Sequence, residues 1–365
     1  MPFHIVKPNV NINFIGRRKI GYTVFAIAML LSLASVIFGN GLKLGIDFAG
    51  GVIAQVHFAQ NIDDQTLKKG LDVPELPGLS IQRYGEVGRD YLLRFNSSEL
   101  SPMELRTRIE QSLVKAFPDN PAAMERLEVV GPKVGKDLTE KGLSAIFYAI
   151  LTIAVYISGR FEQRWMAAAA MAACLWGATY VVGLTGVSTG ILVCVAMAIT
   201  LGVCFFMRLN FALAAVTSLL VVVIVAVGLL SFLSIDLDLN VLAAILTIIG
   251  YALNDTIITF DRLRENLRLH NDKPLDIMIN QSINQTLART VLTVSTTLMA
   301  SVSLLILGGG VIYSFALTMT VGVAVGTFST LFVACPMLLA LGDRDFYAKA
   351  SKQETYEKPG EHGMV

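Results

Sequence analysis

The sequence predicts a polytopic α-helical membrane protein with about eight membrane spans and one α+β domain on the extracytoplasmic side. The 365-residue chain is 54% hydrophobic and has a mean hydropathy of +0.62, which is higher than in soluble globular proteins. Long runs without a charged residue recur along most of it, and such runs suit helices that cross a bilayer. Residues 43–141 are instead polar and of mixed charge, and their length suits one small domain.

The chain begins with a basic segment and a first apolar run. Residues 1–19 end in the sequence Gly16-Arg17-Arg18-Lys19, and residues 20–42 carry no charge. This pattern is typical either of a signal peptide or of a first membrane span. The run is longer than the core of a signal peptide, and no small-x-small cleavage motif follows it. We therefore expect residues 1–42 to form a cytoplasmic N-terminus and an uncleaved first span.

The polar block predicts a compact α+β domain. The motif GIDFAGG (45–51) leads into an alternating strand at 52–58. Ser101, Pro102 and Glu104 form a capping box at the start of a helix at 101–117. The remaining elements are a helix at 63–71 and strands at 79–84, 90–95 and 127–135. The order βαββαβ is that of ferredoxin-like domains, so we expect residues 43–141 to form such a domain in the periplasm.

The sequence from residue 142 to residue 342 predicts seven more spans, which make eight with the first. We expect them near 142–159, 165–185, 189–207, 211–234, 240–260, 287–307 and 311–341. The connections at 160–164, 208 and 261–285 contain Lys or Arg, whereas those at 185–189, 236–238 and 308–310 contain none. By the positive-inside rule, the basic connections and both termini, including the tail 343–365, are cytoplasmic.

The composition argues against several classes of function. A formal net charge of +1 gives no indication of nucleic-acid binding. The four cysteines lie in apolar runs and lack the spacing of metal ligands or redox motifs. The sequence also shows no metal cluster, nucleophile–base arrangement or phosphate-binding loop. We expect no cofactor, no bound metal and no enzymatic activity.

An acidic residue lies within the sixth predicted span. Asp255 is the one charged residue between positions 239 and 260. An ionisable group inside a span costs roughly 2–3 kcal/mol and is commonly retained for a proton or ion pathway. At helical spacing it belongs to a polar stripe that consists of Thr247, Tyr251, Asp255, Thr259 and Arg262. A buried acid that a neighbouring helix satisfies is the alternative interpretation.

The seventh predicted span carries a candidate partner for this acid. Arg289 lies just inside the cytoplasmic end of that span, and antiparallel packing places Asp255 toward the same side. An Arg beside an Asp favours the ionised carboxylate, and separation of the two favours protonation. A proton relay that is coupled to helix movement needs this property. Five nearby hydroxyl residues are suited either to line a hydrated path or to hold helices together. They are Thr290, Thr293, Ser295, Thr296 and Thr297.

Several motifs resemble those of one protein family. They are GIDFAGG (45–51), VVGPKVG (129–135), RFEQRW (160–165), GYALNDTIITFDRLREN (250–266) and QTLARTVLTVSTTL (285–298). Through these motifs the chain resembles the SecF family, whose members are subunits of the bacterial SecDF complex and are related to the RND superfamily of transporters. The resemblance covers essentially residues 10–340. It implies a multi-pass protein of the bacterial inner membrane that uses the proton-motive force to assist protein export.

The same resemblance implies partners and site residues. The implied partners are SecD, the SecYEG channel, YajC, an unfolded preprotein in transit and membrane lipid. Asp255 and Arg289 correspond to the family's intramembrane proton-pathway pair, and Asn254, Tyr251 and Thr259 are further candidates. The positions that match the family's structural motifs are Asp47, Gly50, Gly51, Gly131 and Pro132.

The chain departs from the family pattern in two places. The family usually has six spans, and the two extra predicted spans fall between about 165 and 235. The family also usually carries a His-Asp pair in the span before the acidic outer loop, where this chain has Leu220, Val221 and Val222. A proton-driven translocase subunit is one expected function, and a non-conducting scaffold that stabilises SecD and the channel is another. An RND-like exporter of lipids or small molecules is a third, and either protons or sodium ions fit as the coupling ion.

Overall fold

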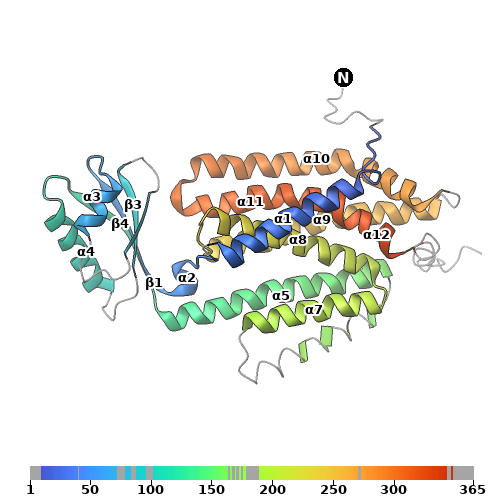
Figure 1. Cartoon of the computed structure of the whole chain (residues 1–365), viewed down its shortest axis with the longest axis horizontal. Helices are drawn as coiled ribbons and strands as arrows, with labels where there is room; N and C mark the ends of the chain where they lie inside the picture. The colour runs from blue at the N-terminus through green and yellow to red at the C-terminus, as the bar shows by residue number, and fades with distance from the viewer. Residues whose placement is uncertain are drawn as a thin grey trace, which may run out of the picture.

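A computed structural model describes residues 10–342 and 347, except for 40, 72–78, 84–87, 96–101, 163–164, 167–168, 170–171, 174–175, 178–188 and 270–272. Its long helices form one bundle, and a small α+β domain lies at one end of that bundle (Figure 1). We call this the domain end, and the opposite end, where the first helix begins, the far end.

The α+β domain contains a four-stranded antiparallel sheet with strand order β2-β3-β1-β4. Its elements are β1 (Gly51–Phe58), α3 (Asp64–Gly70), β2 (Ser80–Arg83), β3 (Asp90–Phe95), α4 (Pro102–Ala116) and β4 (Ala122–Val130), in the predicted order. Alternate residues of β1, including Val52, Val56 and Phe58, are fully buried against Leu67 of α3 and Ile109 of α4. Helices α3 and α4 cover the face of the sheet that points away from the bundle (Figure 1).

The last strand of the domain differs from its predicted position. The sequence predicts a strand at 127–135, whereas β4 covers Ala122–Val130 and α5 (Pro132–Glu162) begins almost at once. Proline lacks a backbone N–H and has a fixed φ, so it suits the first position of a helix and not a central strand position. Pro132 therefore ends the sheet and starts a helix that continues into the bundle, ten residues before the predicted span at 142.

The bundle contains six helices that are long and apolar enough to cross a membrane, within the described residues. They are α1 (Arg18–Phe38), α5, α8 (Asn210–Phe232), α9 (Leu239–Leu269), α10 (Leu275–Leu307) and a last one that comprises α11 (Gly309–Ser329), the π-helix η1 (Thr330–Ala334) and α12 (Cys335–Leu341). Helix α7 (Thr189–Phe206), at the predicted span 189–207, is apolar but shorter. The predicted span 165–185 lies largely outside the described residues.

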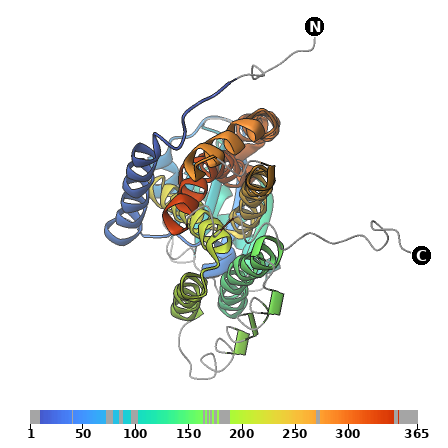
Figure 2. The same cartoon turned by 90° about the vertical axis from the view of Figure 1, so that its right-hand side faces the viewer.

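Helix α8 lies at the centre of the bundle. It has no charged residue and is apolar on all sides, which is typical of a buried helix. It contacts α1, α5, α7, α9 and α11, and Figure 2 shows it (yellow-green) between α1 (blue) and α5 (green). Helices α1 and α10 lie at the periphery, because only 11% of the most apolar window of each is buried.

The helices at the far end extend beyond the predicted spans. The sequence predicts a polar connection at 261–285, but α9 continues to Leu269 and α10 already begins at Leu275. The Arg, Glu, Gln and Leu residues of this region are good helix formers, and polar side chains bond across the two helices as described below. The tight turn predicted at 308–310 is present, with Gly308 at the C-cap of α10 and Gly309 at a φ of +70°.

Candidate functional site

The candidate site is centred on Asp255, near the middle of α9. Its side chain is only 2% exposed, and its Oδ2 atom accepts no hydrogen bond from any described residue. A buried carboxylate oxygen without a partner is costly, and acids inside spans are commonly retained for a proton or ion pathway. Asp255 thus lies in a helix that is long and apolar enough to cross a membrane, and its role stays a prediction.

Small residues let α9 approach α11 closely beside Asp255. A Cβ atom added at Gly326 would lie 3.0 Å from the Cβ of Ala252, and one added at Gly322 would lie 2.2 Å from Cδ1 of Ile248. Close backbone approach through small residues is typical of helix pairs in membranes. The Thr256 and Thr330 hydroxyls are 2.9 Å apart across the same contact. Asp255 is therefore next to a tightly packed helix pair.

Thr330 is the first residue of the π-helix η1. Two positions after η1 ends, Pro336 lacks the N–H that a continuous α-helix needs, and the wider π turn accommodates the missing bond. π-Helical turns inside α-helices are frequent at functional sites. This irregularity was not predicted, although Pro336 within the last apolar run indicates it.

The predicted polar stripe of α9 does not lie on one uniform surface. Asp255 and Thr259 are buried, and Tyr251 is half-buried with a hydroxyl that has no hydrogen-bond partner in the described part of the chain. Thr247 and the neighbouring candidate Asn254 are exposed on the outer side of α9. The stripe therefore runs along the edge between the interior of the bundle and its surface.

Arg289 lies on α10, which packs antiparallel to α9, and its side chain is exposed. Its charge acts on the Asp255 carboxylate, but no direct ion pair joins the two within the described residues. Thr286 and Thr290 are buried on the inner face of α10. The predicted pair is thus close enough for electrostatic coupling but not in contact.

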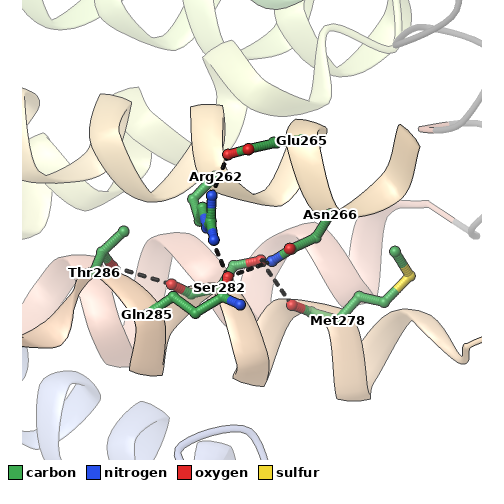
Figure 3. A network of polar contacts seen from close by, with 7 residues as sticks. All are labelled: Arg262, Glu265, Asn266, Met278, Ser282, Gln285 and Thr286. Atoms are coloured by element: carbon green, nitrogen blue, oxygen red, sulfur yellow. Dashed lines mark hydrogen bonds and ion pairs between the residues drawn. The ribbon is translucent and has the colours of Figure 1, made fainter. Parts of the chain in front are cut away.

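A polar network connects α9 and α10 between Asp255 and the far end of the bundle (Figure 3). The Asn266 amide donates to Ser282 Oγ at 2.7 Å and to Gln285 Oε1 at 2.9 Å. Ser282 in turn donates to the backbone oxygen of Met278 at 2.7 Å. These residues were not predicted as part of the site, because the sequence predicts a connecting segment at 261–285. Their signal was the recurrence of polar residues every four positions along α10, at 282, 286 and 290.

Two further residues of α9, Thr259 and Arg262, continue the network in opposite directions. Thr259, one turn beyond Asp255, lies 3.5 Å from Thr286 between their hydroxyl oxygens. Arg262 donates from Nε to Gln285 Oε1 at 2.7 Å and forms an ion pair with Glu265 near the far end. Hydroxyl, amide and guanidinium groups therefore follow one another from the level of Asp255 to the charged end of the bundle.

On the side of Asp255 that faces the domain end, the surrounding side chains are apolar. Val222, where the family usually carries part of its His-Asp pair, is fully buried against Ile248, Val323 and other apolar residues. Val221 is also buried. Ile248 lies two turns from Asp255 toward the domain end, so this cluster separates Asp255 from that end. No titratable group takes the place of the pair at these two positions.

The predicted structural motif residues lie elsewhere, at the joint between the domain and the bundle. Gly50 and Gly51 have φ angles of +75° and +135°, which favour glycine. A Cβ atom at Gly50 would also lie 3.0 Å from Cα of Pro132, so these two motif positions touch. Asp47 hydrogen-bonds the start of α9, as analysed below. Gly131 has a free Cβ position with no described atom within 4 Å, so nothing there requires glycine.

No group of three or more His, Cys, Asp and Glu residues that could hold a metal ion occurs among the described residues. The groups around Asp255 are one carboxylate, several hydroxyls and a more distant guanidinium. This set can take up and release a proton, and it offers no nucleophile–base pair.

Comparison with known proteins places the chain in a family. The family described as "Protein export membrane protein SecD/SecF, C-terminal" matches residues 109–191 and 185–344, and the "SecD/SecF GG Motif" matches residues 35–62. The protein translocase subunit SecF of Calditerrivibrio nitroreducens is 33% identical over 90% of this chain and 94% of its own length. The chain belongs to the SecF family. The SecF subunit of Desulfurispirillum indicum is 36% identical, over 93% of this chain and 95% of its own length.

Solved structures of SecDF share the fold of this SecF-family chain. The crystal structure of SecDF from Thermus thermophilus, a translocon-associated membrane protein, matches 93% of this chain with 29% identity and a TM-score of 0.64. SecDF in its super-membrane-facing form matches 96% with 28% identity and a TM-score of 0.55. The chain spans only 39% and 41% of those two SecDF chains.

Proposed function

We propose that this chain is the SecF subunit of a SecDF-type complex in the bacterial inner membrane, and that it uses the proton-motive force to assist protein export through the SecYEG channel. The observation that carries the proposal is the buried carboxylate of Asp255, whose Oδ2 atom has no described hydrogen-bond partner and which lies beside a polar network. In this role Asp255 is the proton carrier, and the nearby charge of Arg289 controls its ionisation. The function is transport and needs no enzymatic reaction.

The proposed topology places the far end in the cytoplasm and the α+β domain, as a ferredoxin-like domain, in the periplasm. Its support is the clustering of basic residues at the far end, at Arg17, Arg18, Lys19, Arg160 and Arg262. We propose that α7 and residues 165–185 complete eight spans. The sheet order β2-β3-β1-β4 with helices α3 and α4 on one face supports the ferredoxin-like assignment.

The proposed partner SecD covers the outer surface of α9 and α10. Thr247 and Asn254 on α9 and Arg289, Ser295 and Thr296 on α10 are exposed, although they belong to helices that cross the membrane. Polar groups at the surface of a span are stabilised by hydrogen bonds to another helix rather than by lipid. In the complete assembly we expect SecYEG, YajC and an unfolded preprotein as further partners.

A non-conducting scaffold is the second candidate function, and the apolar cluster around Val222 favours it. If no path reaches Asp255 from the domain end, the chain stabilises SecD and the channel without moving protons. The two functions differ in one respect, because only the first needs Asp255 to change its protonation state.

Export driven by an ion gradient separates the two functions. We would purify the SecDF-type complex, reconstitute it with SecYEG in vesicles and compare wild type with Asp255→Asn. Asp276→Asn, an exposed acid in the first turn of α10, is the matched control. Asp255→Asn should retain assembly with SecD but lose the gradient-dependent part of export, while Asp276→Asn behaves as wild type. Unchanged gradient dependence in Asp255→Asn would support the scaffold, and imposing a proton or a sodium gradient would identify the ion.

A further inference from the structure

The first turn of α9 is held by carboxylates from two different parts of the chain. The first backbone N–H groups of a helix have no partner within the helix and need acceptors from elsewhere. Asp238 supplies one, since its Oδ1 accepts from the N–H of Val241 at 2.8 Å. Asp47 supplies the other, since its Oδ2 accepts from the N–H of Leu239 at 3.0 Å. The second acceptor belongs to the GIDFAGG motif, 192 residues away in the sequence.

The backbone of the motif is joined to the same segment. Gly45 donates its N–H to the oxygen of Leu237 at 2.7 Å, and Leu237 donates to the oxygen of Lys43 at 2.8 Å. Leu44 and Leu237 thereby form an isolated parallel β-bridge. The start of α9 is therefore tied by both backbone and side-chain bonds to α2 (Ile46–Ala49), the short helix of the motif.

The α+β domain is connected to this joint by very short segments of chain. At one end only Gly50 separates α2 from β1, and at the other only Gly131 separates β4 from α5. Helix α2 also presses on α5, because a Cβ atom at Gly135 would lie 2.8 Å from the backbone oxygen of Phe48. A displacement of the domain therefore moves α2, and with it Asp47.

The sheet also touches the loop before α9 directly. Arg94 of β3 forms an ion pair with Asp236, and burial lowers the pKa of Arg94 and raises the pKa of Asp238 beside it. A cavity of about 260 Å³ remains between the open face of the sheet and the bundle, and these three residues, Asp47 and Ser314 are among those that line it. In the described part of the chain, the sheet thus meets the bundle through this ion pair and across a cavity lined largely by polar residues.

We propose that Asp47 is a positioning residue through which the α+β domain controls the position of α9, the helix that carries Asp255. Helix α9 is continuous from Leu239 to Leu269, so a shift of its first turn is carried about 24 Å along the helix axis to Asp255. The inference rests on the proposed function, because it gives the domain a means of acting on the proton-carrying acid. A preprotein that engages the domain would act on Asp255 through this joint.

Two variants remove the hydrogen bond from opposite sides. Asp47→Ala removes the acceptor. Leu239→Pro removes the donor without altering the motif, and proline is well tolerated at the first position of a helix. Asp63→Ala is the matched control, because Asp63 accepts from the N–H of Gln65 at the start of α3 and its loss removes a comparable cap without touching α9. Asp47→Asn keeps an acceptor oxygen and serves as the conservative rescue.

The first readout is gradient-dependent export by the reconstituted complex. Asp47→Ala and Leu239→Pro should each reduce its gradient-dependent part about fivefold, the ratio that corresponds to loss of one helix cap. Asp63→Ala and Asp47→Asn should stay close to wild type. If Leu239→Pro behaves as wild type while Asp47→Ala fails, Asp47 serves the folding of the motif alone and the proposal is overturned.

The second readout does not depend on proton transport. In the full chain purified without SecD, and with its four cysteines replaced by alanine, Asn254→Cys places a thiol next to Asp255 on the exposed side of α9. Its rate of labelling by a membrane-permeant maleimide should change about fivefold in Asp47→Ala and Leu239→Pro but not in Asp63→Ala. Unchanged labelling in both variants overturns the coupling. If Asp255→Asn keeps gradient-dependent export but labelling still changes in Asp47→Ala and Leu239→Pro, the proposed function is wrong. The coupling between the domain and α9 is then supported independently of it.

Discussion

Replacement of Gly326 by alanine tests the close contact between α9 and α11 beside Asp255. The added Cβ atom would lie 3.0 Å from the Cβ of Ala252, and both atoms are fixed to backbone, so neither can rotate away. Carbon atoms in contact prefer about 3.5–4.0 Å, so the two helices must separate by roughly 0.5–1 Å. This separation would also stretch the 2.9 Å contact between the Thr256 and Thr330 hydroxyls.

The expected change in the free energy of unfolding has two opposing parts. Overpacking of a tight contact costs about 1–3 kcal/mol. Alanine favours the helix over glycine by about 1 kcal/mol, which offsets part of that cost. Gly250→Ala on α9 isolates the second part, because a Cβ atom there meets no described atom within 4 Å. The free energy of unfolding of Gly326→Ala should therefore be lower than that of Gly250→Ala by about 1–3 kcal/mol.

The assay is reversible unfolding of the purified chain in mixed micelles, followed by helical circular dichroism. A double variant adds a stringent control, since Ala252→Gly with Gly326→Ala moves the single methyl group from one helix to the other. It should recover the wild-type stability to within about 0.5 kcal/mol, which amounts to a strong coupling between the two sites. Equal stability of Gly326→Ala and Gly250→Ala, or additive effects in the double variant, would refute the close contact.

Two further predictions concern the ends of the bundle. Asn284 holds the N-terminal segment, since its Oδ1 accepts from the N–H of Ile12 at 2.8 Å and its amide donates to the Ile12 oxygen at 2.9 Å. Asn284→Ala should speed hydrogen exchange of residues 10–16 about 5- to 100-fold, which corresponds to the loss of two hydrogen bonds. Gln281→Ala should leave this exchange unchanged. Equal exchange rates in the two variants would show that Asn284 does not hold the N-terminal segment. Burial raises the pKa of Asp238 above its ordinary 3.8, so ionised Asp238 destabilises the folded chain. The protonated form of Asp238 therefore favours the folded chain. This contribution to stability is fully present below pH 3.8 and is lost as the pH rises through the raised pKa of the folded state. Asp238→Asn, which can still accept from Val241, should remove this pH dependence from thermal unfolding, and an unchanged pH profile would show that another group causes it.

The sequence sufficed for features that depend on local pattern. Asp255 and Arg289 could be identified because a charge interrupts or borders an apolar run, and the strand β1 because its apolar residues alternate. The predicted position of the last strand was wrong because it included Pro132, which in the structure starts a helix.

Features that depend on the register between distant segments could not be predicted. Asn266 and Ser282 are ordinary polar residues until α9 and α10 pack so that the two side chains meet at 2.7 Å. The bond from Leu239 to Asp47 joins segments that are 192 residues apart, and no local pattern indicates it. Asp255 and Arg289 were identified as candidate partners, but the sequence could not show that the Arg289 side chain is exposed on α10 and that the two form no ion pair within the described residues.

The surroundings of Asp255 differ along the bundle axis, and this difference bears on the missing His-Asp pair. Toward the far end, Thr259 and the polar network continue from Asp255, whereas toward the domain end Val222 and Ile248 belong to an apolar cluster. A proton that arrives from the domain end therefore needs a route around this cluster. In the proposed function, the exposed polar surface of α9 and α10, where Asn254 and Arg289 both lie, is the route for that proton. Under that proposal, valine at positions 221 and 222 does not by itself prevent conduction.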